Sequence, residues 1–361
     1  MKILTIIGAR PQFIKAASIS RKIQEYNDIK EVILHTGQHY DKNMSKLFFD
    51  ELGIKKPKYN LNIISDRHGE QTGKMLIGIE EVITDESPDW VLVYGDTNST
   101  LAGALSASKI HVPIAHVEAG LRSFNKKMPE EINRVITDHV SEALFTPTKI
   151  ATNNLIAEGI ANHRIIEVGD VMYDVTLLFS DIAQNQSKIF KKINRGKDYI
   201  LCTIHRAENT DNPTRLLKIF DQLEIVSSKY PVVIPLHPRT KNKLKSIKFD
   251  FSCSNIQFIE PVGYLDMLNL EKNSLLIITD SGGIQKEAYF HQIPCITLRQ
   301  ETEWQELVEA GYNKLALNDN TPLIDILDQM IQLNFKNDIK FYGDGNSAEK
   351  IINNIVAWKN D

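Results

Sequence analysis

Short apolar runs alternate with longer amphipathic segments along most of this chain, and no other feature constrains the fold as strongly. In the first half of the sequence, buried strands are predicted at residues 3–7, 31–34, 90–94, 113–117 and 143–145. Helical patterns are predicted between them at residues 11–25, 70–83, 99–110 and 130–140. Strands and helices that alternate in this way form a parallel sheet whose two faces are covered by the helices.

The same rhythm resumes after a polar, weakly patterned stretch at residues 184–197, with strands predicted at residues 199–204, 232–236, 255–259, 275–278 and 294–298. Because one domain holds ~100–200 residues, the 361 residues fit two domains. We therefore predict an α/β fold of two doubly wound Rossmann-like domains that face each other across a cleft. They are expected at residues 1–170 and 171–345, with a crossover near 168–174, and a last helix within 346–361 is expected to pack back on the first domain.

Charge, cysteine content and the length of apolar runs argue against several classes of protein. The formal net charge of −4 argues against a nucleic-acid-binding protein with a basic face. Cys202 and Cys295 lie in apolar, strand-like runs and no pair of cysteines has CxxC spacing, which indicates reduced thiols. The N-terminal apolar run is too short for a signal peptide, and no stretch nears the ~20 apolar residues of a membrane span. We expect a cytoplasmic protein with no nucleic-acid or membrane partner.

The first predicted strand is followed by Gly8, Ala9, Arg10 and Pro11. Ligands of open parallel sheets bind outside the carboxyl ends of the strands, so residues at such positions are the first candidates for a site. Gly8 permits a tight turn and Pro11 suits the first turn of a helix, which places Arg10 at a helix N-terminus, a natural anion site. The alternative interpretation is that Arg10 pairs with a surface acid. No GxGxxG motif follows the strand, so no dinucleotide is indicated.

Three acidic residues follow later strands of the first domain. Asp96 comes directly after the strand at residues 90–94, where a helix N-cap is the simpler interpretation. Glu118 follows the strand at 113–117, and glutamate is a poor N-cap, so a functional carboxylate is favoured there. Glu130 begins a helix, suits the helix dipole and is spaced for an ion pair with Arg134. Together the three acids indicate acid–base chemistry, because crowded carboxylates raise one another's pKa.

In the second domain, His205 and Arg206 end one predicted strand and His237 ends the next. A histidine at such a position can be a general acid or stabilise a phosphate leaving group, although a single histidine is more often structural. After the strand at 275–278, a small glycine turn opens a helix whose N–H groups could receive a phosphate. Glu287, in the first turns of that helix, could accept hydrogen bonds from a ribose. The residues of the turn are Ser281, Gly282 and Gly283.

Six motifs stand in order along nearly the whole chain. They are Gly8-Ala-Arg-Pro-Gln, Gly95-Asp-Thr-Asn-Ser-Thr, His116-Val-Glu-Ala-Gly-Leu-Arg, Pro129-Glu-Glu-Ile-Asn-Arg, His205-Arg-Ala-Glu-Asn and Asp280-Ser-Gly-Gly-Ile-Gln-Lys-Glu. Together they closely resemble the non-hydrolysing UDP-N-acetylglucosamine 2-epimerases. The resemblance implies a glycosyltransferase-B-like fold, a homodimer, a UDP-sugar substrate, and catalysis by Asp96, Glu118, Glu130 and His205. No cofactor or metal is expected.

The resemblance also implies which residues bind the substrate. They are Arg10, Lys15, Arg206, His237, Tyr264, Ser281, Gly282, Gly283 and Glu287. Lys15 lies one turn into the first predicted helix, and its alternative interpretation is a solvated lysine. The family's site for a second UDP-sugar matches at Gln38, whereas its second position is Asp41, a carboxylate ill-suited to face a diphosphate.

Within the family, three segments resemble the branch that acts on UDP-2,3-diacetamido-2,3-dideoxy-D-glucuronate. They begin at Leu121, Pro261 and Arg299. The last of them has Trp304 where the enzymes for UDP-N-acetylglucosamine have an arginine. The first is shorter than in those enzymes and contains Lys126 and Lys127, candidates to bind the C6 carboxylate of a uronate. A pair of solvated lysines is the alternative.

The resemblance further implies a route to inversion at C2, from gluco to manno. The C2 proton is not next to a carbonyl group, so simple deprotonation is difficult. UDP would leave C1 as the C2 proton is removed, giving a 2-acetamidoglycal, and would then add back with protonation of the opposite face. Cations suit the departing diphosphate, and carboxylates suit an oxocarbenium-like centre. The sequence leaves open a UDP-sugar glycosyltransferase, a hydrolysing 2-epimerase and a non-catalytic nucleotide-sugar sensor.

Overall fold

The structure is a computed structural model that describes residues 1–38, 53–65, 67–193, 198–316, 321–335 and 340–358. It divides into two compact units. Unit 1 is formed by Met1–Leu178 together with Lys340–Asp361, and unit 2 by Phe179–Ile339. The division falls inside helix α7 (Val171–Gln186), whereas the sequence places the domain boundary at residue 170.

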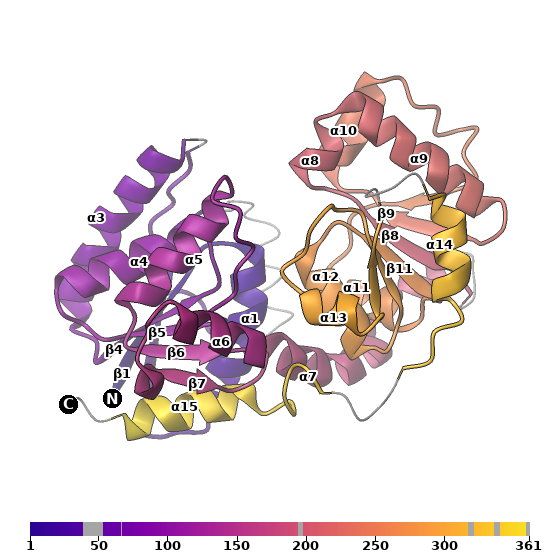
Figure 1. The fold of residues 1–361 in the computed structure, drawn as a ribbon. Coiled ribbons are helices and arrows are strands. Elements are labelled where there is room, and N and C mark those ends of the chain that lie inside the picture. The colour runs from indigo at the N-terminus through magenta and orange to yellow at the C-terminus, as the bar shows by residue number, and fades with distance from the viewer. Residues whose placement is uncertain (39–52, 66, 194–197, 317–320, 336–339, 359–361) are drawn as a thin grey trace. The chain divides into compact units, whose positions relative to one another are not determined.

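Unit 1 is built on a parallel sheet whose seven strands, within the described residues, run in the order β3-β2-β1-β4-β5-β6-β7 (Figure 1). The strands are β1 (Lys2–Ile7), β2 (Lys30–His35), β3 (Tyr59–Asn60), β4 (Trp90–Tyr94), β5 (Ile114–Val117), β6 (Ala143–Thr146) and β7 (Ile165–Glu167). β1 pairs in parallel with β2 on one side and with β4 on the other. The strand order therefore reverses between β1 and β4, the switch point at which doubly wound sheets bind ligands.

Helices pack against this sheet through apolar side chains. They are α1 (Arg10–Ile23), α3 (His68–Glu86), α4 (Asn98–Lys109), α5 (Pro129–Val140) and α6 (Lys149–Ala157), with a short 3-10 helix η1 (Asn162–Arg164) before β7. Ile6 of β1, Met75 of α3 and Ala102 of α4 belong to one buried cluster. The N-cap of α4 is Thr97, whose side chain accepts a hydrogen bond from the N–H of Thr100 at 3.3 Å.

The C-terminal helix α15 (Ser347–Ala357) belongs to unit 1 and packs against α1. The carboxylate of Asp174 in α7 accepts the N–H of Ala348 at 2.7 Å and so caps the first turn of α15. Figure 1 shows this helix, in yellow, next to elements of unit 1 that come from the opposite end of the chain.

Unit 2 repeats the same topology with a parallel sheet whose six described strands run in the order β10-β9-β8-β11-β12-β13. They are β8 (Ile200–Thr203), β9 (Val232–Pro235), β10 (Gln257–Ile259), β11 (Leu276–Thr279), β12 (Cys295–Thr297) and β13 (Asn313–Leu315). β8 pairs in parallel with β9 and with β11, so the switch point of this sheet lies between β8 and β11.

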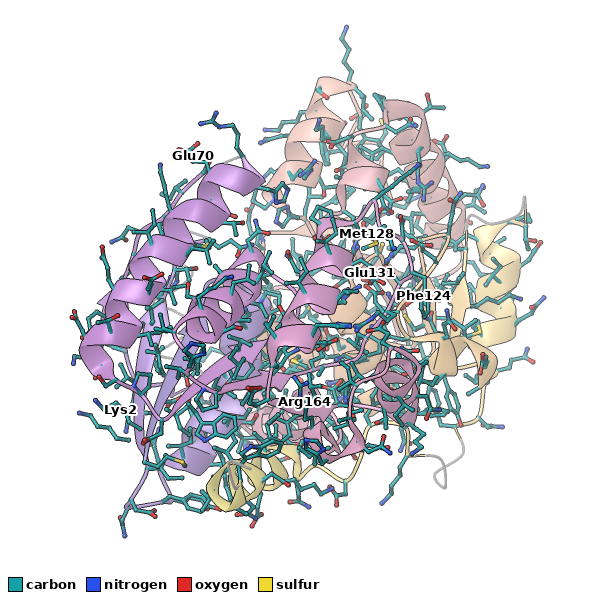
Figure 2. All side chains as sticks on the ribbon, turned by 60° about the vertical axis from the view of Figure 1, so that its left-hand side comes forward. Lys2, Glu70, Phe124, Met128, Glu131 and Arg164 are labelled. Atoms are coloured by element: carbon teal, nitrogen blue, oxygen red, sulfur yellow. The ribbon has the colours of Figure 1, made fainter. Side chains whose placement is uncertain are left out.

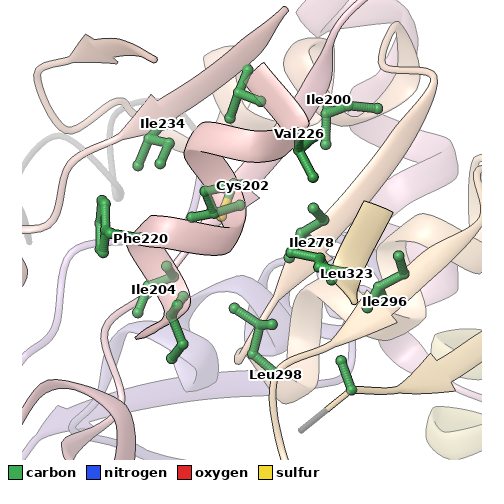
Figure 3. Close-up of a cluster of buried hydrophobic side chains, with 14 of the residues drawn as sticks. Ile200, Cys202, Ile204, Phe220, Val226, Ile234, Ile278, Ile296, Leu298 and Leu323 are labelled. Atoms are coloured by element: carbon green, nitrogen blue, oxygen red, sulfur yellow. The ribbon is translucent and has the colours of Figure 1, made fainter. Parts of the chain in front are cut away.

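The core of unit 2 lies between its strands and its helices. After η2 (Ile189–Lys191), the helices are α8 (Ala207–Thr210), α9 (Pro213–Ser227), α10 (Pro238–Ser246), α11 (Tyr264–Lys272), α12 (Gly282–Phe290), α13 (Gln305–Glu309) and α14 (Leu323–Met330). Figure 3 shows Phe220 and Val226 of α9 packed with Cys202, Ile278 and other strand residues, all of them buried. The thiols of Cys202 and Cys295 are both free and buried, in agreement with their positions in apolar runs of the sequence.

All of the strands predicted from the apolar runs are present, with ends that differ by a few residues. Three further strands, β3, β7 and β13, have only two or three residues and were not predicted. No helix within the described residues is both long enough and apolar enough to cross a membrane.

Candidate active site

The motif turns lie next to the switch points of the two sheets. In unit 1, the turn with Arg10 follows β1 and the turn with Asp96 follows β4. In unit 2, His205 follows β8 and Ser281 follows β11. Each unit therefore gathers predicted site residues at the edge where its own sheet offers a ligand site.

Three successive carbonyl groups at the end of β4 are each held by a buried side chain. They belong to Tyr94, Gly95 and Asp96. Their donors are, in that order, Gln12 Nε2 at 3.0 Å, His116 Nε2 at 2.8 Å and Asn133 Nδ2 at 2.9 Å. The turn that presents Asp96 is thus fixed by α1, β5 and α5 together.

Asp96 is held by the guanidinium of Arg134 in α5. Its Oδ2 accepts hydrogen bonds from Nη2 at 2.6 Å and from Nε at 3.0 Å, and Nη1 of Arg134 contacts Glu131 at 2.9 Å. The Arg134 side chain is 5% exposed and that of Asp96 is 30% exposed, so a buried cation anchors an accessible carboxylate. The N-cap of α4 is Thr97, so the interpretation of Asp96 as a helix cap is wrong.

Glu118 forms an ion pair with Lys15 of α1, and only about a tenth of either side chain is exposed, 8% and 12% respectively. The interpretation of Lys15 as a solvated lysine is therefore wrong. The backbone of Glu118 has φ +71°, a left-handed conformation that is strained for a residue other than glycine and is common at functional sites. At Gly95, a Cβ would lie 3.1 Å from both Glu118 Oε2 and Lys15 Nζ, so glycine leaves room for the pair.

Glu130 is exposed in the first turn of α5. Its predicted ion pair with Arg134 is not formed among the described residues, since that guanidinium contacts Asp96 and Glu131 instead. Glu130 is therefore the most solvated of the three predicted acids.

Glu131 folds the preceding loop onto the start of α5. Its carboxylate accepts the N–H groups of Ser123 at 2.9 Å and Phe124 at 2.8 Å, and Figure 2 shows Phe124, Met128 and Glu131 grouped together. Burial alone would raise the pKa of Glu131, but these backbone hydrogen bonds and Arg134 hold it below its ordinary value. The buried carboxylate thus fixes both the loop and Arg134.

The remaining predicted residues of unit 1 lie in a loop, at a helix start and beside α4. Lys126 and Lys127 are exposed in the loop that Glu131 holds. Arg10 is the first residue of α1, so its predicted place at a helix N-terminus is confirmed, although its side chain is outside the described part. Gln38 Oε1 accepts hydrogen bonds from Ser99, and Asp41 lies outside the described residues.

In unit 2, the buried carboxylate of Asp280 holds His205. It accepts the N–H groups of His205 and Arg206 at 3.1 and 3.0 Å and the Nδ2 of Asn209 at 3.0 Å. His205 Nδ1 lies 3.2 Å from Oδ1, while 41% of the His205 side chain is exposed. Burial alone would raise the pKa of Asp280, but the hydrogen bonds, first that of His205, hold it below its ordinary value. The carboxylate orients an accessible imidazole, an arrangement suited to proton transfer.

The glycine turn after β11 begins α12, as predicted. Trp304 Nε1 donates a hydrogen bond to the carbonyl of Gly282 at 2.9 Å, and the ammonium of Lys286 lies 4.1 Å from the centroid of the Trp304 ring. A Cβ at Gly282 would lie 3.8 Å from Arg206 Nη2 and 3.6 Å from Glu303 Oε1. A helix N-terminus with a guanidinium beside it suits a phosphate group.

Three other predicted residues of unit 2 lie at or near helix starts. Glu287 is buried in the second turn of α12. His237 is exposed at the N-cap of α10, and its ring centroid is 5.8 Å from that of His205. Tyr264, the first residue of α11, is only 2% exposed and contacts Phe179 edge-on.

The residues that hold the predicted site residues in place were not themselves predicted as part of the site. Gln12, His116, Asn133 and Asp280 are all at least 95% buried, although each is polar. The available signal was their position inside the six motifs, because a buried polar side chain needs specific partners.

Comparison with known proteins shows to which family the chain is similar. A family model described as UDP-N-acetylglucosamine 2-epimerase matches residues 21–356. A Pseudomonas aeruginosa protein named UDP-2,3-diacetamido-2,3-dideoxy-D-glucuronate 2-epimerase is 51% identical over 354 residues, covering 97% of this chain and 98% of that protein. A Methanocaldococcus jannaschii protein named UDP-N-acetylglucosamine 2-epimerase is 50% identical over 371 residues, with coverages of 99% and 100%.

Solved structures agree with these relatives. The crystal structure of Methanocaldococcus jannaschii UDP-GlcNAc 2-epimerase in complex with UDP-GlcNAc and UDP has a TM-score of 0.91 at 48% sequence identity, and 99% of this chain and 100% of that chain are covered. The two doubly wound sheets and these similarities define an isomerase with the predicted glycosyltransferase-B-like fold. The chain belongs to the UDP-N-acetylglucosamine 2-epimerase family. The resemblance predicted from the six motifs is confirmed.

Proposed function

We propose that this protein is a non-hydrolysing UDP-HexNAc 2-epimerase that inverts C2 by elimination and re-addition of UDP through a 2-acetamidoglycal. The observation that carries this proposal is that Asp96 and Glu118 are each paired with a largely buried cation at the carboxyl edge of a doubly wound sheet. Elimination across C1 and C2 needs such groups, because a proton must leave one face of C2 and return to the other.

In this proposal, Asp96, Glu118 and Glu130 act on the sugar. Their environments differ, since Asp96 faces Arg134, Glu118 faces Lys15, and Glu130 is exposed to solvent. Carboxylates in different environments can take opposite roles, one accepting a proton while another donates one. The same carboxylates stabilise the oxocarbenium-like centre that develops at C1.

The departing UDP is held mainly by unit 2 in this proposal. His205, oriented by Asp280, stabilises the phosphate that leaves C1. The N–H groups at the start of α12 and the Arg206 guanidinium bind the diphosphate. Glu287 accepts hydrogen bonds from the ribose, and Arg10 adds positive charge from the N-terminus of α1. Lys15, His237 and Tyr264 complete the proposed substrate contacts.

For the sugar, we propose UDP-2,3-diacetamido-2,3-dideoxy-D-glucuronate, with UDP-N-acetylglucosamine as the alternative. Relatives named for either sugar are about equally similar, at 51% and 50% identity. The exposed Lys126 and Lys127 favour the uronate, because its C6 carboxylate needs a cation. NMR spectra of reaction mixtures with the two sugars, recorded side by side, test this choice. A higher kcat/KM for UDP-N-acetylglucosamine would overturn it.

We further propose that the enzyme is a cytoplasmic homodimer that supplies a precursor for surface polysaccharides such as capsule or O-antigen. The buried free thiols of Cys202 and Cys295 support a reducing compartment. Light scattering coupled to size-exclusion chromatography tests the dimer, and a monomeric mass in solution would contradict it.

A further inference from the structure

His116 is a buried side chain that the proposed mechanism does not use. It belongs to β5, is 0% exposed, and lies between two hydrogen-bond partners. Its Nδ1 is 2.7 Å from Asp138 Oδ1, and its Nε2 is 2.8 Å from the carbonyl oxygen of Gly95.

Both partners accept hydrogen bonds. A carbonyl oxygen has no proton to donate, so Nε2 of His116 must carry one. Asp138 also accepts from Arg122 Nη1 at 2.7 Å and from the N–H of Gly120 at 3.1 Å. Both of these donors contact Oδ2, and one of them is a guanidinium that is always charged, so the ionised form of the carboxylate is favoured without any contribution from His116. Nδ1 therefore carries a proton as well.

We propose that His116 is a doubly protonated, positively charged positioning residue that holds the Gly95 carbonyl and thereby fixes the turn that carries Asp96. The proposal rests on the epimerase function proposed above for its link to the reaction. His116 does not contact the substrate in this account, and it acts through the turn.

The surroundings of His116 suit a buried cation. The charges alternate from Glu158 through Arg122 and Asp138 to His116, and Arg122 contacts Glu158 with two nitrogens at 2.7 Å each. Buried charges are tolerated when each is paired and hydrogen-bonded in this way. A charged donor also makes a stronger hydrogen bond to the Gly95 carbonyl than a neutral imidazole would make.

The turn that His116 holds restricts the positions of the two carboxylates beside it, those of Asp96 and Glu118. Gly95 has φ +63°, and the Lys15–Glu118 pair packs against its Cα. The hydrogen bond from His116 fixes the peptide plane between Gly95 and Asp96. A shift of that plane would move Asp96 relative to Arg134 and would disturb Glu118 at the same time.

The protonation state can be measured directly on the full-length enzyme. Nitrogen-15 NMR of histidine-labelled wild-type protein near neutral pH should show a proton on both ring nitrogens of His116, with imidazolium chemical shifts. Through-space contacts from the Nε2 proton to the Gly95 α-protons assign the signals without any variant. A bare nitrogen on the His116 ring would overturn the proposal.

Kinetics test the positioning role. His116→Gln removes the charge, and kcat per folded molecule should fall by about 10²-fold, as misplacement of reacting groups by about 1 Å can do. KM for the UDP-sugar should stay within about twofold, because most of the proposed UDP contacts are in unit 2. A merely structural role would lower the melting temperature and leave kcat per folded molecule unchanged, and that result would overturn the proposal.

His139→Gln is the matched control. His139 lies in α5, its side chain is 47% exposed, and it should tolerate the change with unaltered kcat. The two proposals fail separately. A wild-type enzyme that converts no UDP-sugar would refute the proposed function. A singly protonated His116 in an active enzyme would refute only the positioning role.

Discussion

Two nitrogens of Arg134 contact one carboxylate oxygen of Asp96, at 2.6 and 3.0 Å, while the third nitrogen of the same guanidinium contacts Glu131. One buried cation thus connects the acid that follows β4 with the acid that fixes the loop before α5. The geometry depends on the planar fork of the guanidinium, which a lysine ammonium cannot reproduce.

Arg134→Lys should therefore lower kcat more than it lowers stability. The charge is retained, but Asp96 loses its two-point contact, and a loss of about 10- to 100-fold in kcat is expected. Steady-state kinetics together with thermal unfolding check this. Arg67→Lys, at an exposed ion pair with Glu70, is the control and should leave kcat unchanged. Wild-type kcat in Arg134→Lys would contradict the role given to the Asp96 contact.

Asp280→Asn tests the orientation of His205. An amide in place of the carboxylate brings its own N–H group toward the donors of His205, Arg206 and Asn209. We expect kcat to fall by about 10²-fold or more, the usual scale of acid–base catalysis. The pH dependence of kcat should change as well. Asp211→Asn, a half-exposed acid just after α8, is the control, and equal kcat for the two variants would refute the role of Asp280.

The sugar preference can be assigned to the loop before α5. Replacement of both Lys126 and Lys127 by alanine should raise KM for the diacetamido-uronate by about 10-fold or more, because a charge-assisted contact to its C6 carboxylate is lost. KM for UDP-N-acetylglucosamine, which has no such carboxylate, should change little. Unchanged uronate turnover would show that these lysines are only solvated.

The contacts of Glu86 predict that unit 1 loses part of its stability in acid. Hydrogen bonds from Lys58, Tyr59 and Lys2 lower its pKa to about 2 from an ordinary value of 4.5. The native state therefore gains stability from the carboxylate above pH 4.5, and the gain is lost as the pH falls toward about 2. Glu86→Gln should lower the free energy of unfolding near neutral pH, and its difference from wild type should close in acid.

Urea unfolding at several pH values measures this difference. Glu80→Gln removes an exposed acid from the same helix, α3, and should change the free energy of unfolding by less than about 0.5 kcal/mol. A Glu86→Gln difference that stays constant down to about pH 2 would show that the ion pairs of Glu86 do not stabilise the native state.

The strand series could be predicted because parallel strands covered on both faces are continuous apolar runs. The five residues of β4 are all buried, and their sequence is apolar throughout. β3 and β7 lack this pattern, since they are edge strands of two and three residues with partly exposed side chains. The helix α7 was not predicted as the element inside which the chain divides into two units, because a continuous helix carries no turn residues at a boundary.

The site residues that directly follow a strand could be predicted from the sequence. Asp96, Glu118 and His205 each follow a strand, and the sequence identifies them on that basis. Their partners depend on tertiary packing. Arg134 was assigned to Glu130 by helical spacing, yet its partner Asp96 is 38 positions away in the chain, and Asp280 contacts His205 across 75 positions. Such long-range pairs leave no periodic pattern in a single sequence.

The proposed function depends above all on elimination and re-addition of UDP at C1 and C2. It is tested most directly by incubating the enzyme with UDP-N-acetylglucosamine or the diacetamido-uronate in D₂O, without any acceptor, and following the products by NMR. This mechanism should place deuterium at C2 of sugars that remain linked to UDP, in both epimers. Epimers formed without deuterium, or free sugar and UDP as the final products, would contradict it.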